Sequence, residues 1–83
     1  MVHLTMEMPE GALASLRKDP TGFAQEMRLV AAIKWYELRQ VSQERAAQIA
    51  GISRAEFIAA LGRYGVSPFQ YGAQEIQEEA LSD

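Results

Sequence analysis

The N-terminal residues alternate regularly between apolar and polar side chains. Residues 2–8, VHLTMEM, have an apolar residue at every second position. A period of two is typical of a β-strand, and Pro9 would end the strand because proline cannot donate a hydrogen bond to a neighbouring strand. The pattern therefore predicts an N-terminal strand. It needs a partner segment or a second copy of the chain, because one strand alone is unstable in water.

From residue 10 onward the apolar spacing predicts helices instead. Residues 10–17 form a short predicted helix, and Asp19 followed by Pro20 is a typical start for the next one, over about residues 20–39. The apolar stripe of this second helix is unusually wide for a surface helix, which indicates a central position or burial between two subunits. The stripe consists of Phe23, Met27, Leu29, Val30, Ile33, Trp35, Tyr36 and Leu38.

Two short predicted helices follow and form the most informative part of the sequence. Ser42 can cap a helix over residues 43–50, and Gly51 can supply the left-handed turn before a helix over residues 54–63. This spacing predicts a helix-turn-helix. In the DNA-binding form of that motif the second helix enters the major groove with its N-terminal end. Ser53, Arg54 and Ala55 would then face the bases, with Ile58 and Ala59 one turn further on.

The same stretch also has a purely structural interpretation. Ser53 and Glu56 have the spacing of a capping box, and Ile52 with Phe57 has the spacing of a hydrophobic staple. Arg54 is then the one residue at this helix start that can read a base, because arginine can donate two hydrogen bonds to a guanine edge. The sequence leaves both interpretations open, a surface that reads DNA and a compact helical hairpin.

The charge distribution favours DNA only in the middle of the chain. The net charge of the 83 residues is −3, which argues against a nucleic-acid partner. Residues 28–64, however, carry six Lys or Arg against three Glu, a local charge of +3, and residues 65–83 carry four acidic residues and no basic one. Ordinary solvated charge remains the alternative for each possible phosphate contact. The candidate DNA-binding residues are Lys34, Arg39, Ser42, Arg45, Ser53, Arg54, Ala55, Ile58 and Arg63.

No group of residues indicates catalysis, a metal site or a cofactor. Cysteine is absent and His3 is the single histidine, so neither a thiolate zinc site nor a catalytic triad is available. The 48% hydrophobic composition of so short a chain favours a homodimer, because pairing would bury the surplus apolar surface. No apolar run approaches the roughly 20 residues of a membrane span, and no secretory signal is recognisable. We expect a cytoplasmic protein that is not an enzyme.

The residues after Gly65 differ in character from the helical part. Residues 66–71 are expected to be extended, and the following acidic segment places apolar residues between polar ones. Such a segment can lie in the groove of a partner protein, or it can cover the core of its own chain. We therefore expect a dimerisation and helix-turn-helix domain over residues 1–65 and an acidic partner-binding tail over residues 66–83. The candidate partner-binding residues are Phe69, Tyr71, Ile76 and Leu81.

Several motifs in order carry a resemblance to a known family. They are AAIKWYEL at residues 31–38, AA at 46–47, AGISR at 50–54, EF at 56–57 and LGRYGV at 61–66. From about residue 4 to residue 80 the chain resembles a family of small bacterial and archaeal proteins that are taken to be VapB-like antitoxins paired with PIN-domain toxins. The resemblance implies that the N-terminal and central part dimerises and binds operator DNA. It also implies that the C-terminal part occupies a toxin ribonuclease.

The sequence as a whole predicts a mainly α protein with an N-terminal β-strand and a dimeric helix-turn-helix core, acting as antitoxin and autorepressor. The tail has no Arg or Lys after Arg63. Because a PIN nuclease site is acidic, we expect the tail to bind beside that site rather than to block it. Two alternatives stay open. One is a stand-alone transcription regulator, and the other is a protein-binding adaptor without DNA contact, which the apolar Ile58 and Ala59 favour.

Overall fold

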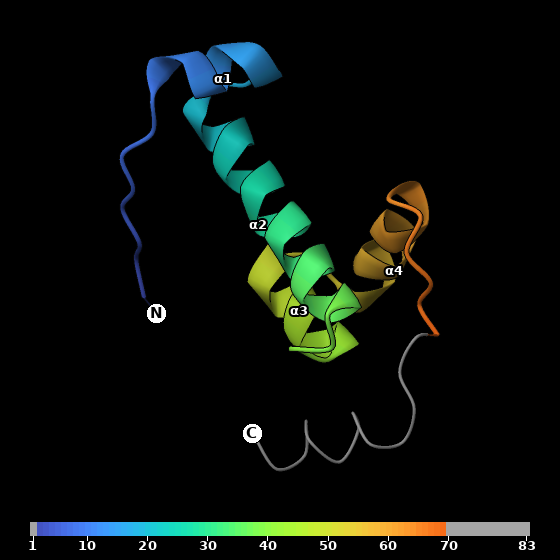
Figure 1. Ribbon diagram of the computed structural model, residues 1–83. Coiled ribbons are helices and arrows are strands. Elements are labelled where there is room, and N and C mark those ends of the chain that lie inside the picture. The colour runs from blue at the N-terminus through green and yellow to red at the C-terminus, as the bar shows by residue number, and fades with distance from the viewer. Residues whose placement is uncertain (1, 70–83) are drawn as a thin grey trace.

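The structure is a computed structural model that describes residues 2–69, and over these residues the chain forms four helices (Figure 1). They are α1 (Glu10–Leu16), α2 (Pro20–Glu37), α3 (Gln43–Ala50) and α4 (Arg54–Arg63). The long helix α2 runs through the molecule, α1 lies across its N-terminal end, and α3 and α4 lie at its C-terminal half (Figure 1). Each of the four predicted helices is confirmed to within two residues at either end.

The predicted helix starts are confirmed by their hydrogen bonds. The Asp19 carboxylate accepts from a backbone N–H of the first turn of α2 at 2.7 Å, and the Ser42 hydroxyl does the same for α3 at 3.0 Å. At α4 the capping box is complete. The Glu56 N–H donates to the Ser53 hydroxyl at 3.1 Å, and the Ser53 N–H donates to the Glu56 carboxylate at 2.9 Å. Helix starts depend on residues three positions apart, which is why the sequence pattern predicts them well.

The hydrophobic core lies where the C-terminal half of α2 meets α3 and α4. The Tyr36 and Phe57 rings pack edge to face there, with centroids 5.9 Å apart and planes at 90°. Alanines on the inner face of α3 let the helices approach closely. Leu29, Val41, Ile49 and Ile52 pack around this centre. The buried residues are Ala32, Ile33, Tyr36, Ala46, Ala47, Ala50, Phe57, Ala60, Leu61 and Val66.

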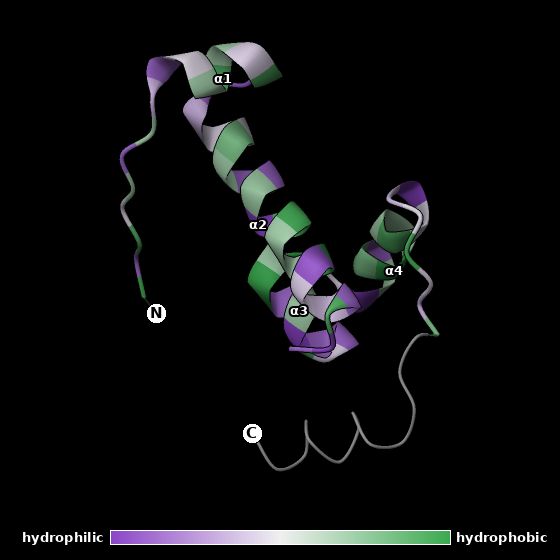
Figure 2. Cartoon of the chain, in the orientation of Figure 1, coloured by the Kyte–Doolittle hydropathy of each residue, from purple (hydrophilic) through white to green (hydrophobic). Residues whose placement is uncertain are grey.

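The prediction of an N-terminal strand is wrong. Residues 2–9 run as a single segment ahead of α1, and no strand occurs anywhere between residues 2 and 69 (Figure 1). The alternation itself is present (Figure 2), but its apolar members Val2, Leu4, Met6 and Met8 are 83%, 84%, 57% and 41% exposed. A period of two becomes a strand only where a second extended segment exchanges backbone hydrogen bonds with it. The described residues supply no such segment, so their fold is all-helical.

The wide apolar stripe of α2 is only partly covered by the chain itself. Ala32, Ile33 and Tyr36 are buried against α3 and α4, so α2 is central as predicted. Trp35 and Leu38 remain 42% and 53% exposed. Their burial between subunits stays a prediction.

Candidate nucleic-acid interface

The turn between α3 and α4 consists of Gly51, Ile52 and Ser53 and has a well-defined backbone. Gly51 has a φ of +75°, the left-handed conformation that glycine adopts without steric cost. Its N–H donates to the Gln48 carbonyl at 3.1 Å, and the Ile52 N–H donates to the Ala47 carbonyl at 3.1 Å. These bonds close the end of α3. The half-buried Ile52 then packs against the core, which sets the direction in which α4 departs.

Arg28 of α2 supports this turn by contacting the last carbonyl groups of α3. Its Nε donates to the Ile49 carbonyl at 2.7 Å, and its Nη2 lies 3.5 Å from the Gln48 carbonyl. A cation at these carbonyls also interacts favourably with the negative end of the α3 dipole. A Cβ on Gly51 would come within 3.1 Å of Arg28 Nη2, so the glycine leaves room for the guanidinium. No local sequence pattern indicates this role of Arg28, because its contacts lie about twenty residues further along the chain.

The outer face of α4 is the surface that a recognition helix would present to DNA. Phe57, Ala60 and Leu61 point into the core, and the opposite side of the helix is open to solvent. Helical spacing places the predicted Arg54, Ala55 and Ile58 together on the N-terminal part of this open side, with Ile58 38% exposed. Ala59 and Gly62 continue it. The surface therefore combines one cation with small and apolar residues.

Ser53 and Glu56 belong to the start of α4. Each accepts a hydrogen bond from the backbone N–H of the other, as the capping box requires. The Ser53 backbone N–H, and then its hydroxyl, hold the pKa of Glu56 below its ordinary value, against a small opposing effect of burial. Glu56 therefore carries its negative charge at neutral pH, one turn from the positive helix end. Of the residues predicted to face the bases, Arg54 has the most hydrogen-bond donors.

Arg54 is joined to the core through Gln43, the first residue of α3. Arg54 Nε donates to Gln43 Oε1 at 2.9 Å. Gln43 Nε2 donates to the Pro68 carbonyl at 3.1 Å and to the Tyr36 hydroxyl at 3.3 Å. The Tyr36 hydroxyl donates to the same Pro68 carbonyl at 2.9 Å. Gln43 was absent from the predicted site, since no local motif indicates that a glutamine will meet an arginine eleven positions later.

The remaining predicted residues lie on several elements, and some have contacts of their own. Lys34 donates to the Glu37 carboxylate of its own helix at 2.9 Å, and Arg45 donates to the Gln48 side chain at 2.8 Å. Arg39 is exposed in the turn after α2, with a φ of +63°. Ser42 caps α3. Arg63 lies nine residues after Arg54, which separates the two by about 13 Å along the axis of α4.

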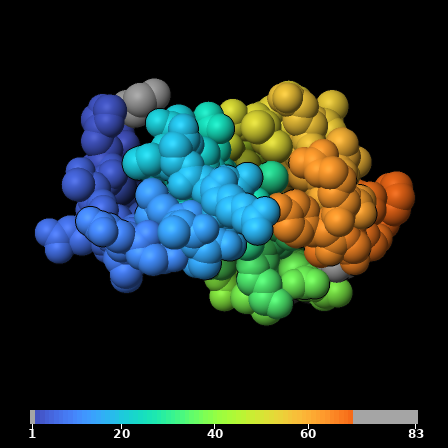
Figure 3. Space-filling view, turned by 90° about the horizontal axis from the view of Figure 1, so that it is seen from above, coloured from blue at the N-terminus to red at the C-terminus, as the bar shows by residue number. Residues whose placement is uncertain are grey.

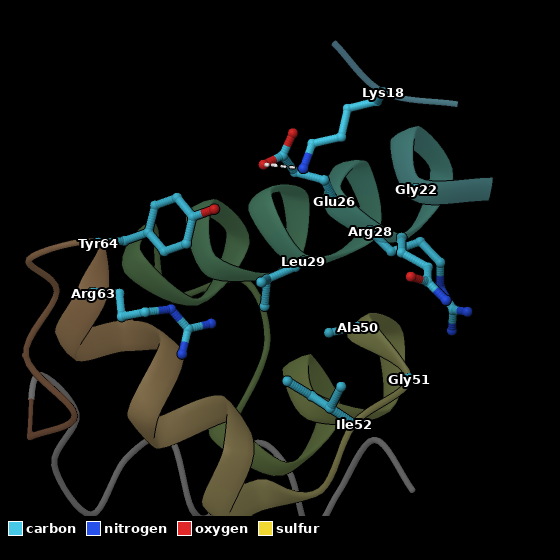
Figure 4. Close-up of a pocket in the computed structure, with 11 residues that line it drawn as sticks. Lys18, Gly22, Glu26, Arg28, Leu29, Ala50, Gly51, Ile52, Arg63 and Tyr64 are labelled. Carbon is cyan, nitrogen blue, oxygen red and sulfur yellow. Dashed lines mark ion pairs between the residues drawn. The ribbon is translucent and has the colours of Figure 1, made fainter. Parts of the chain in front are cut away.

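Arg63 lies in an open groove between α2 and α4 (Figure 4). In the close-up, the Arg63 and Tyr64 side chains extend toward Leu29 of α2, and Ile52 reaches into the same space (Figure 4). Seen from above, the light-blue residues near position 20 lie next to the orange end of α4 (Figure 3). The groove has a volume of about 500 Å³. It is lined by Lys18, Gly22, Gln25, Glu26, Arg28, Leu29, Ala50, Gly51, Ile52, Arg63 and Tyr64.

The comparison with known proteins identifies the family. The chain matches the family described as "Uncharacterised protein family (UPF0175)" over residues 1–81. The chain belongs to the UPF0175 family. A UPF0175 protein of Aeropyrum pernix is 33% identical over 76 residues, which cover 92% of this chain and 80% of that relative. No solved structure matches the chain. The pairing with PIN-domain toxins that the resemblance implied stays a prediction.

Other features of this UPF0175 chain bear on the remaining predictions. Phe69, the first predicted partner-binding residue, is 89% exposed. Tyr71, Ile76 and Leu81 lie outside the described residues. Over residues 2–69, no helix is long and apolar enough to cross a membrane. The same residues hold no group of three or more His, Cys, Asp or Glu side chains placed to bind a metal ion.

Proposed function

We propose that this UPF0175 chain binds operator DNA through α3 and α4 and acts as the autorepressing antitoxin of a toxin-antitoxin pair. The observation that carries the proposal is the solvent-exposed outer face of α4, which starts with Arg54. The Nη1 and Nη2 groups of Arg54 make no hydrogen bond or ion pair with residues 2–69. They are therefore available to bond a guanine edge. Arg54 lies at the N-terminal end of α4, the end that a recognition helix inserts into the major groove.

The neighbouring residues suit this contact. Ala55 is small enough for the backbone of α4 to approach the floor of the groove, and Ile58 can touch a thymine methyl group. The Glu56 carboxylate already occupies the positive end of α4, so attraction for phosphate oxygens comes from the Lys and Arg side chains. The local charge of +3 over residues 28–64 acts in the same direction.

A homodimer is part of the proposal. Trp35, Leu38 and Val30 give α2 an exposed apolar surface that a second copy would cover. A two-fold dimer would carry two copies of α4. For both to enter successive major grooves on one side of the duplex, they must lie about 34 Å apart.

The second part of the proposal is toxin neutralisation, with a PIN-type ribonuclease bound by the C-terminal segment. The supporting observation is Phe69, a large aromatic side chain that is exposed where the described residues end. Tyr71, Ile76 and Leu81 continue this spacing of apolar anchors among acidic residues. The choice of a PIN-type ribonuclease as the partner rests on the resemblance described above.

The DNA-binding proposal is tested by titrating the protein against the DNA upstream of its own gene at a series of salt concentrations. We expect specific binding that Arg54→Ala weakens by about 1–3 kcal/mol, the contribution of one bidentate arginine–guanine pair. The slope of the logarithm of the binding constant against the logarithm of the salt concentration should stay unchanged in this variant, because a base contact releases no counterion. Loss of a phosphate contact would lower the slope by about 0.9. Arg17→Ala, which removes an exposed cation from the end of α1, is the matched control.

Two outcomes would contradict DNA reading by α4. One is the absence of specific binding at low salt, and the other is an equal loss for Arg17→Ala and Arg54→Ala. The adaptor function would then be favoured, since Ile58 and Ala59 are exposed on the same face. In that case Ile58→Asp should lose a protein partner that the wild-type chain retains in affinity purification, whereas Arg54→Ala should keep it.

A further inference from the structure

Gln43 connects Arg54 to the core through a continuous set of hydrogen bonds. On one side its Nε2 group donates to the Pro68 carbonyl and the Tyr36 hydroxyl, at 3.1 and 3.3 Å. On the other side its Oε1 accepts from Arg54 Nε at 2.9 Å. Tyr36 is 1% exposed and its ring is packed against Phe57. One end of the network is therefore fixed inside the protein, and the other end is the residue proposed to read DNA.

The chemistry of the partners determines the orientation of the Gln43 amide. The Pro68 carbonyl can only accept a hydrogen bond, and Arg54 Nε–H can only donate one. A flipped amide would place Gln43 Oε1 against the carbonyl oxygen and its NH₂ group against the guanidinium. Both contacts would then be repulsive. Gln43 is therefore held in one orientation, with its oxygen directed at Arg54.

This contact restricts how Arg54 can bind a ligand. A guanidinium offers two donor pairs to a bidentate acceptor, either Nε with one Nη or the two Nη groups together. Nε is already bonded to Gln43, so the end-on pair Nη1 and Nη2 remains. An anchored arginine also loses less conformational freedom when it binds than a free one does.

We propose that Gln43 is a positioning residue for DNA specificity. It holds Arg54 so that both Nη groups address one guanine end-on. The inference rests on the proposed function, DNA binding by α4, and adds to it the residue that sets base preference without reading the base itself. Removing Gln43 would free Nε and the guanidinium together, which lowers the preference for guanine at the position that Arg54 reads.

The experiment uses the full chain and a duplex pool with about 20 randomised base pairs, enough for two half-sites one helical turn apart. Wild type selects its preferred duplex, and each guanine of that duplex is then replaced in turn. Affinities are measured for Gln43→Ala, Gln43→Met, Arg54→Ala and the double variant Gln43→Ala/Arg54→Ala. Gln43→Met is nearly isosteric and keeps the packing. Gln25→Ala, an exposed glutamine on α2, is the matched control.

We expect Arg54→Ala to reduce discrimination at one guanine position by roughly 5- to 150-fold. In both Gln43 variants, discrimination at that same guanine position should fall by about 3- to 10-fold, which is a fraction of what the bidentate arginine–guanine pair contributes. In the Arg54→Ala background, Gln43→Ala should cause no further loss, because the two residues act through one contact. Gln25→Ala should keep the wild-type preference.

Three results would overturn the positioning role. They are additive losses in the double variant, an equal weakening on every duplex, and an unchanged guanine preference in both Gln43 variants. A wild-type chain that selects no sequence from the pool would contradict the proposed function itself. Thermal unfolding of each variant shows whether it still folds, which separates loss of fold from loss of guanine preference. None of the substitutions removes a partner of the Tyr36–Pro68 hydrogen bond.

Discussion

Gly51 lies against the guanidinium of Arg28, and this contact gives a quantitative test of how α2 supports the turn between α3 and α4. A Cβ at position 51 would meet Arg28 Nη2 at 3.1 Å and Nη1 at 3.2 Å, closer than ordinary van der Waals contact. The guanidinium would have to shift by a few tenths of an ångström, which strains the hydrogen bond that its Nε donates to the Ile49 carbonyl at 2.7 Å. Gly51→Ala should therefore impair two features of the turn, its backbone conformation and its arginine contact.

The two costs can be assigned separately. A φ of +75° costs a residue with a side chain about 1–2 kcal/mol relative to glycine. The solvent-exposed hydrogen bond of Arg28 contributes about 1 kcal/mol, including its interaction with the end of α3. We predict that Gly51→Ala lowers the free energy of unfolding by about 2–3 kcal/mol. A chain of 83 residues has a total stability of about 4–12 kcal/mol, so a measurable transition should remain.

Urea unfolding of four variants, followed by far-UV circular dichroism, measures these terms. Arg28→Ala alone should cost about 1 kcal/mol. The double variant Gly51→Ala/Arg28→Ala should cost up to about 1 kcal/mol less than the sum of the single changes, because both weaken the same hydrogen bond. Gly62→Ala is the control. A Cβ there meets nothing within 4 Å, so this change should be neutral or stabilise α4 by up to about 1 kcal/mol.

Strict additivity of Gly51→Ala and Arg28→Ala would refute the steric reasoning. So would a Gly51→Ala variant as stable as Gly62→Ala, because the left-handed backbone at the turn would then carry no cost.

Three further predictions concern the capping box, the polar network and the core. The pKa of Glu56 is lowered in the folded chain, so its contribution is present above the ordinary glutamate pKa of about 4.3 and is lost as the pH falls through the lower folded value. Thermal unfolding across this range should show a steeper acid loss for wild type than for Glu56→Gln, and parallel curves would contradict this. Tyr36→Phe removes a hydrogen bond to the Pro68 carbonyl and should cost about 1 kcal/mol in urea unfolding; an unchanged midpoint would count against that bond. Phe57→Ala empties a fully buried site and should cost about 3–5 kcal/mol, enough to remove most of the cooperative transition seen by calorimetry; a loss below about 1 kcal/mol would show that the site is not tightly packed.

The outer face of α4 could be predicted because it depends on helical periodicity alone. Once residues 54–63 are helical, Phe57, Ala60 and Leu61 share one side, and Ala55, Ile58 and Ala59 lie on the other, with Arg54 at the border. The supports of that face could not be predicted. Arg28 contacts carbonyls 20 and 21 positions away, and Gln43 joins Arg54 to Pro68 across 11 and 25 positions. No short pattern contains both partners of any of these contacts.

The starts and ends of the helices follow from short-range features of the sequence. Asp19, Ser42, Ser53 and Gly51 act on backbone groups within a few residues, so their effect is independent of the rest of the fold. Whether an alternating segment pairs with another one depends instead on the folded chain. Residues 2–8 have the alternation of a strand, but a strand exists only through hydrogen bonds to another segment, and nothing between residues 2 and 69 supplies them. Helix caps depend on neighbouring residues, whereas strand pairing depends on which distant segments the folded core brings together.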